Sequence, residues 1–460
     1  MTTKKNICII GAGIGGLTTG LLLTKQGHTV HIFEKEKCVG GRARSFKGDD
    51  LTLDEYTSIL SKTHMNLPFS EPSLDTIFEK KMLNGYTLDL GFHVIGGEVQ
   101  TYLKQMLSPF NQQVNLLGSR LGYIHENGFN YPFLSKGDKF KMIPLVLRLL
   151  LARESTMKQL DQVSMTETIK KYGKGKMKLV LEVFPRVITT VNNLDTISTG
   201  ETFRAQKNLL QGAKPVGYPQ QGLTHISDAI VQCIIQNKGT IHLNTPVSGI
   251  SISNGKATGI VTEGKDQSFD AVISNTLVQD LFTIAPEKHF PSEYVNTVQS
   301  LEGTGSLCAY YSLKHVDARL LGKTFLFIQR NAGVNGNDAV GMIDFMTALP
   351  ESRLSPESHY LVQSYIICTP KEAKTNVEHL REILDNQLHH LIPEYRSNLD
   401  WAIYPAIWQL DGVAKTITDI KPEIKTPVEN LYLVGDCVKA PGIGINCALN
   451  SAQLVQSYIT

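Results

Sequence analysis

The sequence lacks the residue patterns of a metal centre or a disulfide framework. Its seven cysteines are odd in number, scattered along the chain and without CxxC spacing. They are therefore expected to be reduced thiols, as in cytoplasmic proteins. The thirteen histidines form no HExxH or comparable ligand pattern. We accordingly predict that no metal ion is bound.

The chain also lacks a long hydrophobic run and a strong net charge. No stretch reaches the roughly 20 apolar residues that span a bilayer; residues 142–152 come nearest, with Pro144 and Arg148 inside them. Lys4 and Lys5 lead directly into an apolar run, so no secretory signal is expected. The formal charge of +2 gives no global basic field, which argues against nucleic acid as a partner. We predict a cytoplasmic protein.

One segment carries a local excess of positive charge. Residues 136–178 contain eleven lysines and arginines against four acidic residues, and they include the apolar run at 142–152. An apolar helix beside lysines is typical of peripheral contact with anionic lipid, which would place the protein on the cytoplasmic face of a membrane. The same pattern fits a buried helix of a substrate domain beside a solvated lysine loop. The sequence alone leaves both interpretations open.

Length and composition indicate a large globular protein. At 460 residues the chain exceeds a single hydrophobic core, so two or three compact units are expected. Hydrophobic residues make up 42% and charged residues 19%, which is ordinary for a globular protein and not for a disordered one.

A glycine-rich turn near the N-terminus has the pattern of a dinucleotide-binding motif. Residues 5–10 form an apolar run of strand type that leads directly into Gly11, Gly13 and Gly16. Gly11 permits a tight turn, Gly13 lets the backbone approach a pyrophosphate, and Gly16 lets the following helix lie close to the sheet. The N-terminus of that helix is expected to bind the pyrophosphate through its free N–H groups and its dipole.

Glu34 follows at the distance expected for a ribose ligand. It ends a second predicted strand at 28–33, about twenty residues after the glycines. A carboxylate there accepts hydrogen bonds from the adenosine ribose, and we place the neighbouring Lys35 in the same site. No arginine follows directly, so a 2′-phosphate is not favoured. A tight turn without any ligand is the alternative interpretation.

The segment after Glu34 resembles a flavoprotein signature. Residues 35–45 read KEKCVGGRARS, which is similar to the shared motif of the flavin amine oxidase, protoporphyrinogen oxidase and phytoene desaturase superfamily. The resemblance implies that Arg42 contacts the cofactor diphosphate and that Gly41 lets the backbone pass beside it. A guanidinium suits phosphate because its planar fork of donors binds two oxygens at once. The implied cofactor is FAD.

Three later segments continue the resemblance. Residues 88–93 are similar to the loop that lies beside the flavin, and Val247 matches a valine that contacts the adenine. Near the C-terminus, Asp436 matches the acid that holds the ribityl or phosphate region. The turn at 442–445 is expected to aim a helix N-terminus at the flavin pyrimidine, where its dipole stabilises negative charge. The predicted cofactor-binding residues are Gly11, Gly13, Ile14, Gly15, Gly16, Glu34, Lys35, Gly41, Arg42, Gly91, Phe92, His93, Val247, Gly435, Asp436, Gly442, Ile443 and Gly444.

The order of the predicted elements indicates an α/β fold with a Rossmann-type FAD-binding domain, made of a parallel sheet and a β-meander, and a substrate domain of mixed antiparallel sheet and helices. The predicted FAD-binding domain comprises residues 1–48, 86–98, 216–280 and 425–460. The substrate domain comprises a mostly helical part at 99–215, which is the part that would contact a membrane, and sheet and helices at 281–424.

Two details of this prediction concern the connections. Residues 49–85 are predicted to be an insertion, either a decorated surface loop or a lid or partner surface. Asn254-Gly255 marks a tight hairpin within the meander, and residues 269–274 are expected to close that meander.

The expected chemistry is desaturation of a carbon–carbon bond in a hydrophobic, isoprenoid- or carotenoid-like substrate, with hydride transfer to flavin N5. A second glycine motif for NAD(P)H is absent from the sequence, so oxygen, a quinone or another diffusible acceptor is expected to take the electrons. The catalytic base is not identified. His93 is the one titratable residue in a motif expected near the flavin, and a structural hydrogen bond in its loop is its alternative role.

Other functional classes remain open at this point. An FAD-containing isomerase would rearrange a polyene without net redox, and a porphyrinogen or amine oxidase would keep the redox chemistry but change the substrate. A flavin-free lipid-binding protein resembling GDP-dissociation inhibitors belongs to a different class. Glu34 and Arg42 argue against this last class, because a protein without FAD has no use for them.

Overall fold

One half of the molecule is built on a parallel sheet whose strands come from distant parts of the chain. The computed structural model describes residues 3–459. Five strands lie in the order β11, β2, β1, β15 and β21, and every neighbouring pair is parallel. Their bounds are Asn6–Ile10 (β1), Thr29–Phe33 (β2), Thr240–His242 (β11), Ala271–Ser274 (β15) and Leu431–Leu433 (β21). The predicted Rossmann-type sheet is confirmed.

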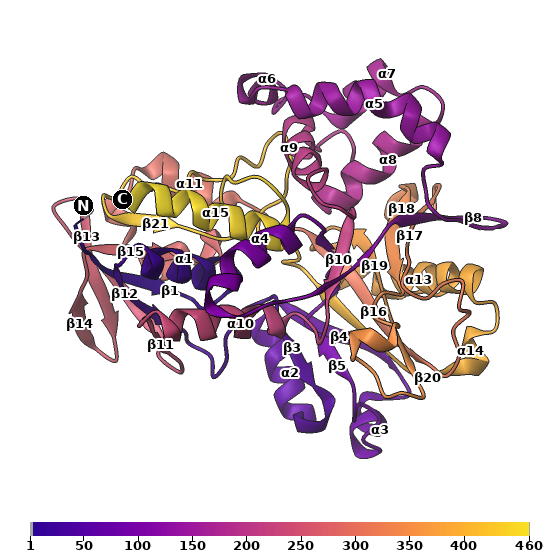
Figure 1. Ribbon diagram of the computed structural model, residues 1–460, viewed down its shortest axis with the longest axis horizontal. Helices are drawn as coiled ribbons and strands as arrows, with labels where there is room; N and C mark the ends of the chain where they lie inside the picture. The colour runs from indigo at the N-terminus through magenta and orange to yellow at the C-terminus, as the bar shows by residue number, and fades with distance from the viewer. Residues whose placement is uncertain (1–2, 460) are drawn as a thin grey trace.

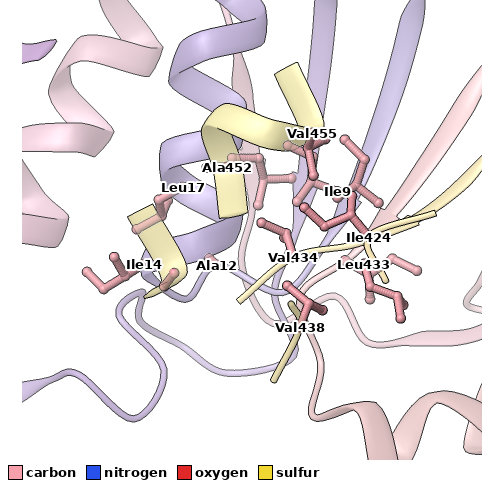
Figure 2. Packing of buried hydrophobic residues seen from close by; sticks show 14 of the residues in the cluster. Ile9, Ala12, Ile14, Leu17, Ile424, Leu433, Val434, Val438, Ala452 and Val455 are labelled. Atoms are coloured by element: carbon pink, nitrogen blue, oxygen red, sulfur yellow. The ribbon is translucent and has the colours of Figure 1, made fainter. Parts of the chain in front are cut away.

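Two helices from opposite ends of the chain pack together against this sheet. They are α1 (Ile14–Lys25) and α15 (Gly444–Ile459), and α1 also packs against α10 (Thr224–Gln236). Figure 2 shows Leu17 of α1 beside Ala452 of α15, within the same buried cluster. This packing brings the first glycine motif and the C-terminal motif to one place.

The β-meander forms a separate three-stranded sheet. It consists of β12 (Val247–Ser253), β13 (Lys256–Thr262) and β14 (Lys265–Ser268). Asn254 and Gly255 both have positive φ, at 50° and 75°, as the predicted tight hairpin requires. The prediction that residues 269–274 close the meander is wrong, because β15 lies between β1 and β21 in the parallel sheet. All four β15 residues are buried, which is typical of a central parallel strand.

The other half contains an eight-stranded mixed sheet, in the order β4, β20, β16, β19, β18, β17, β8 and β9. Its neighbouring strands are antiparallel except for β17 and β8. The bounds are Met65–Glu71 (β4), Leu121–His125 (β8), Gly128–Asn130 (β9), Gly305–Leu313 (β16), Thr324–Gln329 (β17), Ala339–Asp344 (β18), Tyr360–Cys368 (β19) and Leu399–Ile407 (β20). This sheet confirms the prediction of a second domain that contains a mixed sheet.

Short strands and further helices connect the segments of the two halves. The small strands are β3 (Ser45–Lys47), β5 (Thr87–Asp89), β6 (Ile95–Gly96), β7 (Leu116–Ser119) and β10 (Val216–Pro219). Seven further α-helices lie outside residues 136–209 in the described part of the chain. They are α2 (Leu53–Lys62), α3 (Leu74–Glu79), α4 (Val99–Leu107), α11 (Ser292–Ser300), α12 (Glu372–Thr375), α13 (Val377–Leu391) and α14 (Tyr395–Asn398). α13 packs on β16 and β19 of the large sheet.

Residues 49–85 are more than a decorated surface loop. They contain α2, β4 and α3, and β4 pairs with β20 at the edge of the eight-stranded sheet. The strand was not predicted because Pro68 lies inside it. An edge strand tolerates proline, since one side of the strand needs no hydrogen-bond donor.

A bundle of helices covers residues 136–209. It consists of α5 (Lys136–Leu151), α6 (Glu154–Gln159), α7 (Met165–Tyr172), α8 (Lys176–Thr189) and α9 (Thr199–Leu209). In Figure 1 this bundle gathers at one end of the molecule, and α2 and α3 project on the opposite side. No residue of α5 is buried, so the interpretation of α5 as a buried helix is wrong. Among residues 3–459, no helix is both long and apolar enough to cross a membrane.

Candidate functional site

One large cavity connects the parallel sheet with the helical bundle. It encloses about 1850 Å³ and is lined by the glycine turn, α2, the segment after β5, the α5–α9 bundle and the C-terminal motif. Predicted site residues from both ends of the chain meet in this one space. Gly16, Gly91 and Gly442 are the three that do not line it, and they shape the backbone behind it.

The N-terminus of α1 presents free donors to this cavity. Gly13 precedes the helix without a side-chain cap, and the Gly16 N–H donates to Asn275 Oδ1 at 2.9 Å. The N–H groups of Ile14 and Gly15 have no acceptor among residues 3–459. Unpaired first-turn N–H groups form an anion-binding site. A Cβ on Gly16 would lie 2.2 Å from Gly11 O, so glycine is required for this close turn.

Glu34 lies at the end of β2 on the cavity wall and is 8% exposed. Its Oε2 accepts a hydrogen bond from Ala12 N at 2.7 Å, and its Oε1 accepts one from Glu36 N at 3.0 Å. The carboxylate is therefore held rigidly beside the glycine turn. Each of its oxygens keeps further lone-pair capacity, which suits ribose hydroxyls.

Arg42 and Asp436 form an ion pair although 394 positions separate them in the chain. Arg42 Nη2 lies 2.6 Å from Asp436 Oδ1, and Arg42 Nη1 donates to Gln409 O at 2.8 Å. Asp436 Oδ2 accepts from Gly412 N at 2.9 Å. Burial alone would raise the pKa of Asp436, but Arg42, the Gly412 N–H and Lys421 together hold that pKa well below its usual range. Asp436 is therefore ionised at neutral pH.

The N-terminus of α15 opens on the same cavity. Ile443 O accepts from the N–H groups of Asn446 and Cys447, whereas those of Gly444 and Ile445 have no acceptor within residues 3–459. A Cβ on Gly444 would meet no atom within 4 Å, so this side of the turn is open. Two helix N-termini with free donors, from α1 and α15, therefore face one space.

The loop that carries His93 is held by a buried network that sequence reasoning missed. Asp89 accepts hydrogen bonds at 2.5 Å from Ser45 Oγ and from Tyr218 Oη, and Tyr310 Oη donates to Asp89 O at 2.9 Å. Burial raises the pKa of Asp89 to about 6. The available signal was a tyrosine, which carries a hydroxyl group, inside each of two buried strands, Tyr218 in β10 and Tyr310 in β16.

His93 faces the cavity as a neutral base. Its Nδ1 lies 3.2 Å from Gly91 O, so this nitrogen is the donor of the ring. Burial lowers the pKa of His93 to about 4, and no residue in the range 3–459 bonds to its Nε2. Close by, Phe92 stacks on Tyr365 with ring centroids 4.5 Å apart. Tyr365 also lines the cavity and was not predicted.

The far part of the cavity is apolar. It extends between the helices of the α5–α9 bundle, and the side chains on its walls there include Met142, Val146, Leu149, Leu181, Phe184 and Phe203. Its exposed rim carries the basic residues Lys139, Arg148 and Lys171. Within the described range 3–459, no group of three or more His, Cys, Asp or Glu side chains is placed to hold a metal ion.

These features fit FAD as the cofactor. Glycine backbone lines the turn where a Cβ would fill the space, and two helix N-termini offer free N–H donors of the kind that bind a pyrophosphate. The chain belongs to the family of flavin containing amine oxidoreductases, whose sequence model matches residues 76–455. The model of NAD(P)-binding Rossmann-like domains matches residues 9–68. FAD is the cofactor of this family member.

Carotenoid enzymes are among the curated relatives. A phytoene desaturase of Fusarium fujikuroi is 26% identical over 325 residues, which cover 67% of this chain and 55% of that protein. The chain thus spans about half the length of this relative. A 4,4'-diaponeurosporene oxygenase of Staphylococcus haemolyticus is 23% identical over 511 residues, which cover 99% of this chain and 97% of that protein.

Solved structures share the whole fold. An oxidoreductase from Methanosarcina mazei matches with a TM-score of 0.72 at 21% identity, over 98% of this chain and 99% of that one. A RAB GDI from Plasmodium falciparum matches with a TM-score of 0.55 at 13% identity, over 100% of this chain and 98% of that one. The fold alone therefore does not separate an oxidoreductase from a GDI; the family match does.

Proposed function

We propose that this enzyme desaturates carbon–carbon bonds of a hydrophobic, isoprenoid- or carotenoid-like substrate. The apolar part of the cavity, which continues from the cofactor residues into the α5–α9 bundle, is the observation that supports this most directly. A long hydrocarbon chain would gain about 0.8 kcal/mol for each CH₂ group buried there. The Fusarium relative named phytoene desaturase favours the same substrate class.

Bound FAD supplies a two-electron acceptor for the hydride that leaves the substrate. The chain's own residues would hold and orient it: the α1 N-terminus the pyrophosphate, Glu34 the ribose, and the α15 N-terminus the pyrimidine. The apolar walls of the bundle exclude water from the reacting carbon atoms. Exclusion of water protects an electron-deficient carbon chain from hydration.

His93 is the proposed proton acceptor. A substrate that has lost a hydride is strongly acidic at the neighbouring carbon, so a weak base removes the proton. His93 meets this need because it lines the cavity, no described residue bonds to its Nε2 and its low pKa keeps the ring neutral. Of the other buried acids of the cavity wall, Asp436 is paired with Arg42 and Asp411 with Lys415, and Glu34 is held by hydrogen bonds from Ala12 N and Glu36 N.

Electrons are then proposed to leave to a diffusible acceptor, oxygen or a quinone. The sequence has one glycine-rich dinucleotide motif, which the FAD site uses. A small acceptor needs no second nucleotide site, and the wide cavity leaves room for one beside the cofactor.

Peripheral contact with a membrane through residues 136–178 is the proposed route to such a substrate. On α5, Phe140 is 76% and Leu151 is 80% exposed, and the cavity rim beside them is basic. Apolar side chains flanked by lysines bind anionic bilayers, with about 1 kcal/mol from each basic group. The substrate would then enter the cavity without crossing water.

Product analysis tests the reaction. The FAD-loaded enzyme is incubated aerobically with linear polyenes, with porphyrinogens and with amines, and products are identified by mass and absorption. Desaturation predicts polyene products that have lost two hydrogens. Products of unchanged mass would indicate an isomerase, and turnover of porphyrinogens or amines alone would refute the proposed substrate class.

Vesicle sedimentation tests the membrane contact. We expect the protein to sediment with anionic vesicles and less with neutral ones. Phe140→Ser with Leu151→Ser should reduce the bound fraction, whereas the matched control Ile235→Ser with Ile420→Ser, at exposed positions outside the bundle, should not. Equal binding of both variants would contradict the proposed surface.

A further inference from the structure

α2 presents two different faces, one to the core and one to the cavity. Tyr56 and Leu60 are 2% and 3% exposed and pack into a hydrophobic cluster with residues of the eight-stranded sheet. The side chains that line the cavity recur at intervals of three and four, which places them on one side of the helix. They are Asp54, Glu55, Ser58, Ile59 and Lys62.

Two ion pairs join this helix to the segment that follows Glu34. Lys37 Nζ lies 2.9 Å from Glu55 Oε1, and Lys62 Nζ lies 3.1 Å from Glu36 Oε2. Glu55 is near the first turn of α2 and Lys62 is its last residue, so the helix is tied at both ends. Glu36 and Lys37 line the same cavity as Glu34.

The position of α2 is fixed by its neighbours in the chain. β3 precedes it and pairs with β5, and β4 follows it and pairs with β20. The strands on either side of α2 therefore fix where the helix lies, and Figure 1 shows it beside β3.

We propose that α2 is a wall of the cofactor site, supplied by residues 49–85, which retains FAD at its adenosine end. The pairs Lys37–Glu55 and Lys62–Glu36 hold this wall against the loop that carries the ribose-facing Glu34. Retention of FAD is separate from the identity of the substrate, so this role stands apart from the desaturase proposal.

The rate of FAD release from the holoenzyme tests this role. After dilution, free FAD is followed by its fluorescence in the absence of substrate. Lys62→Glu or Glu36→Lys places like charges opposite each other, and each should speed release roughly 2- to 5-fold. The double exchange Glu36→Lys/Lys62→Glu restores opposite charges and should return the rate to near that of the wild type. The single-variant effects should shrink at high salt.

Two further variants test whether the effect on FAD release is specific to α2. Lys80→Glu, directly after α3, makes the same charge change away from the cavity and should leave the release rate unchanged. Ile59→Ala removes apolar contact from the wall without changing charge and should also speed release. Unaltered release in Lys62→Glu and Ile59→Ala, or a double exchange as fast as its single variants, would overturn the proposal.

Discussion

The Arg42–Asp436 pair offers a quantitative test of the cofactor cradle, because it joins the second and the last predicted motif. Asp436→Asn keeps the shape of the side chain and one acceptor oxygen, but it removes the charge that compensates Arg42. Asp436 receives a 2.6 Å bond from Arg42 and a 2.9 Å bond from Gly412 N. A hydrogen bond to a charged group contributes about 1.5–3 kcal/mol, so we expect a loss of about 2–3 kcal/mol in the free energy of unfolding.

A double-mutant cycle separates the pair from its surroundings. Arg42→Gln should cost a similar amount, since it leaves Asp436 buried without its guanidinium partner, with Gly412 N, Lys421 and the weak donor Cys437 Sγ nearby. The double variant should cost about 1–3 kcal/mol less than the two single losses together, because neither charge remains unpaired. Urea denaturation of the FAD-free protein, followed by circular dichroism, gives the three values. Strictly additive losses would refute the coupling that this structure implies.

The pH dependence of the same variant has a definite sign. The pKa of Asp436 is lower in the folded protein than in the unfolded chain, where it is about 3.9. Its contribution to stability is therefore fully present above the unfolded value and is lost as the pH falls through the folded value. The difference between wild type and Asp436→Asn should stay constant from about pH 5 to 8 and shrink below about pH 4. A difference that grows on acidification would contradict the assignment.

Three further predictions concern the turn, the buried carboxyl and the proposed base. Gly16→Ala should weaken FAD binding roughly 5- to 150-fold, measured by flavin content, because its Cβ would lie 2.2 Å from Gly11 O. Gly20→Ala would meet only side-chain atoms of Ile32 and Ile9 and should bind FAD normally. Burial raises the pKa of Asp89 to about 6, so the folded protein favours the protonated side chain. This contribution to the free energy of unfolding is lost as the pH rises from about 4 to 6. Asp89→Asn should abolish that loss in denaturation curves, and an unchanged pH profile would contradict the prediction. His93→Gln should slow flavin reduction by substrate roughly 10²- to 10⁴-fold with unchanged FAD content, and an unaltered rate would exclude His93 as the base.

Local patterns were sufficient to predict the glycine turn of the cofactor sheet and the presence of a second sheet within residues 281–424. The turn at Gly11–Gly16 is a strand, a tight turn and a helix in one continuous segment, so the sequence carries the whole motif. In that region β16, β17 and β19 are mostly buried on both faces, and such strands form short, largely apolar runs.

Partner choice between strands was harder to predict. The apolar run at 269–274 was placed in the meander next to it in sequence, although its hydrogen bonds go to β1 and β21. β4 was not predicted because it contains Pro68, and proline is disfavoured in strands other than edge strands. Both errors have one cause: pairing with distant strands leaves no local signature beyond hydrophobicity.

The site residues likewise divide into those with a local sequence pattern and those brought together only by the fold. Glu34 and Arg42 were recognisable from their spacing, whereas Asn275, Tyr365 and the α2 wall depend on contacts between segments far apart in the chain. The network around Asp89 joins Ser45, Tyr218 and Tyr310, which no sequence window contains together. Such groups become visible only when the two halves of the molecule are assembled.

Anaerobic mixing of the FAD-loaded enzyme with a linear polyene tests the central claim most directly. If the apolar part of the cavity places a carbon–carbon bond against the cofactor, the yellow flavin absorbance should bleach in a single turnover and return when oxygen or a quinone is added. A flavin that stays fully oxidised in the presence of every polyene tested would contradict the account.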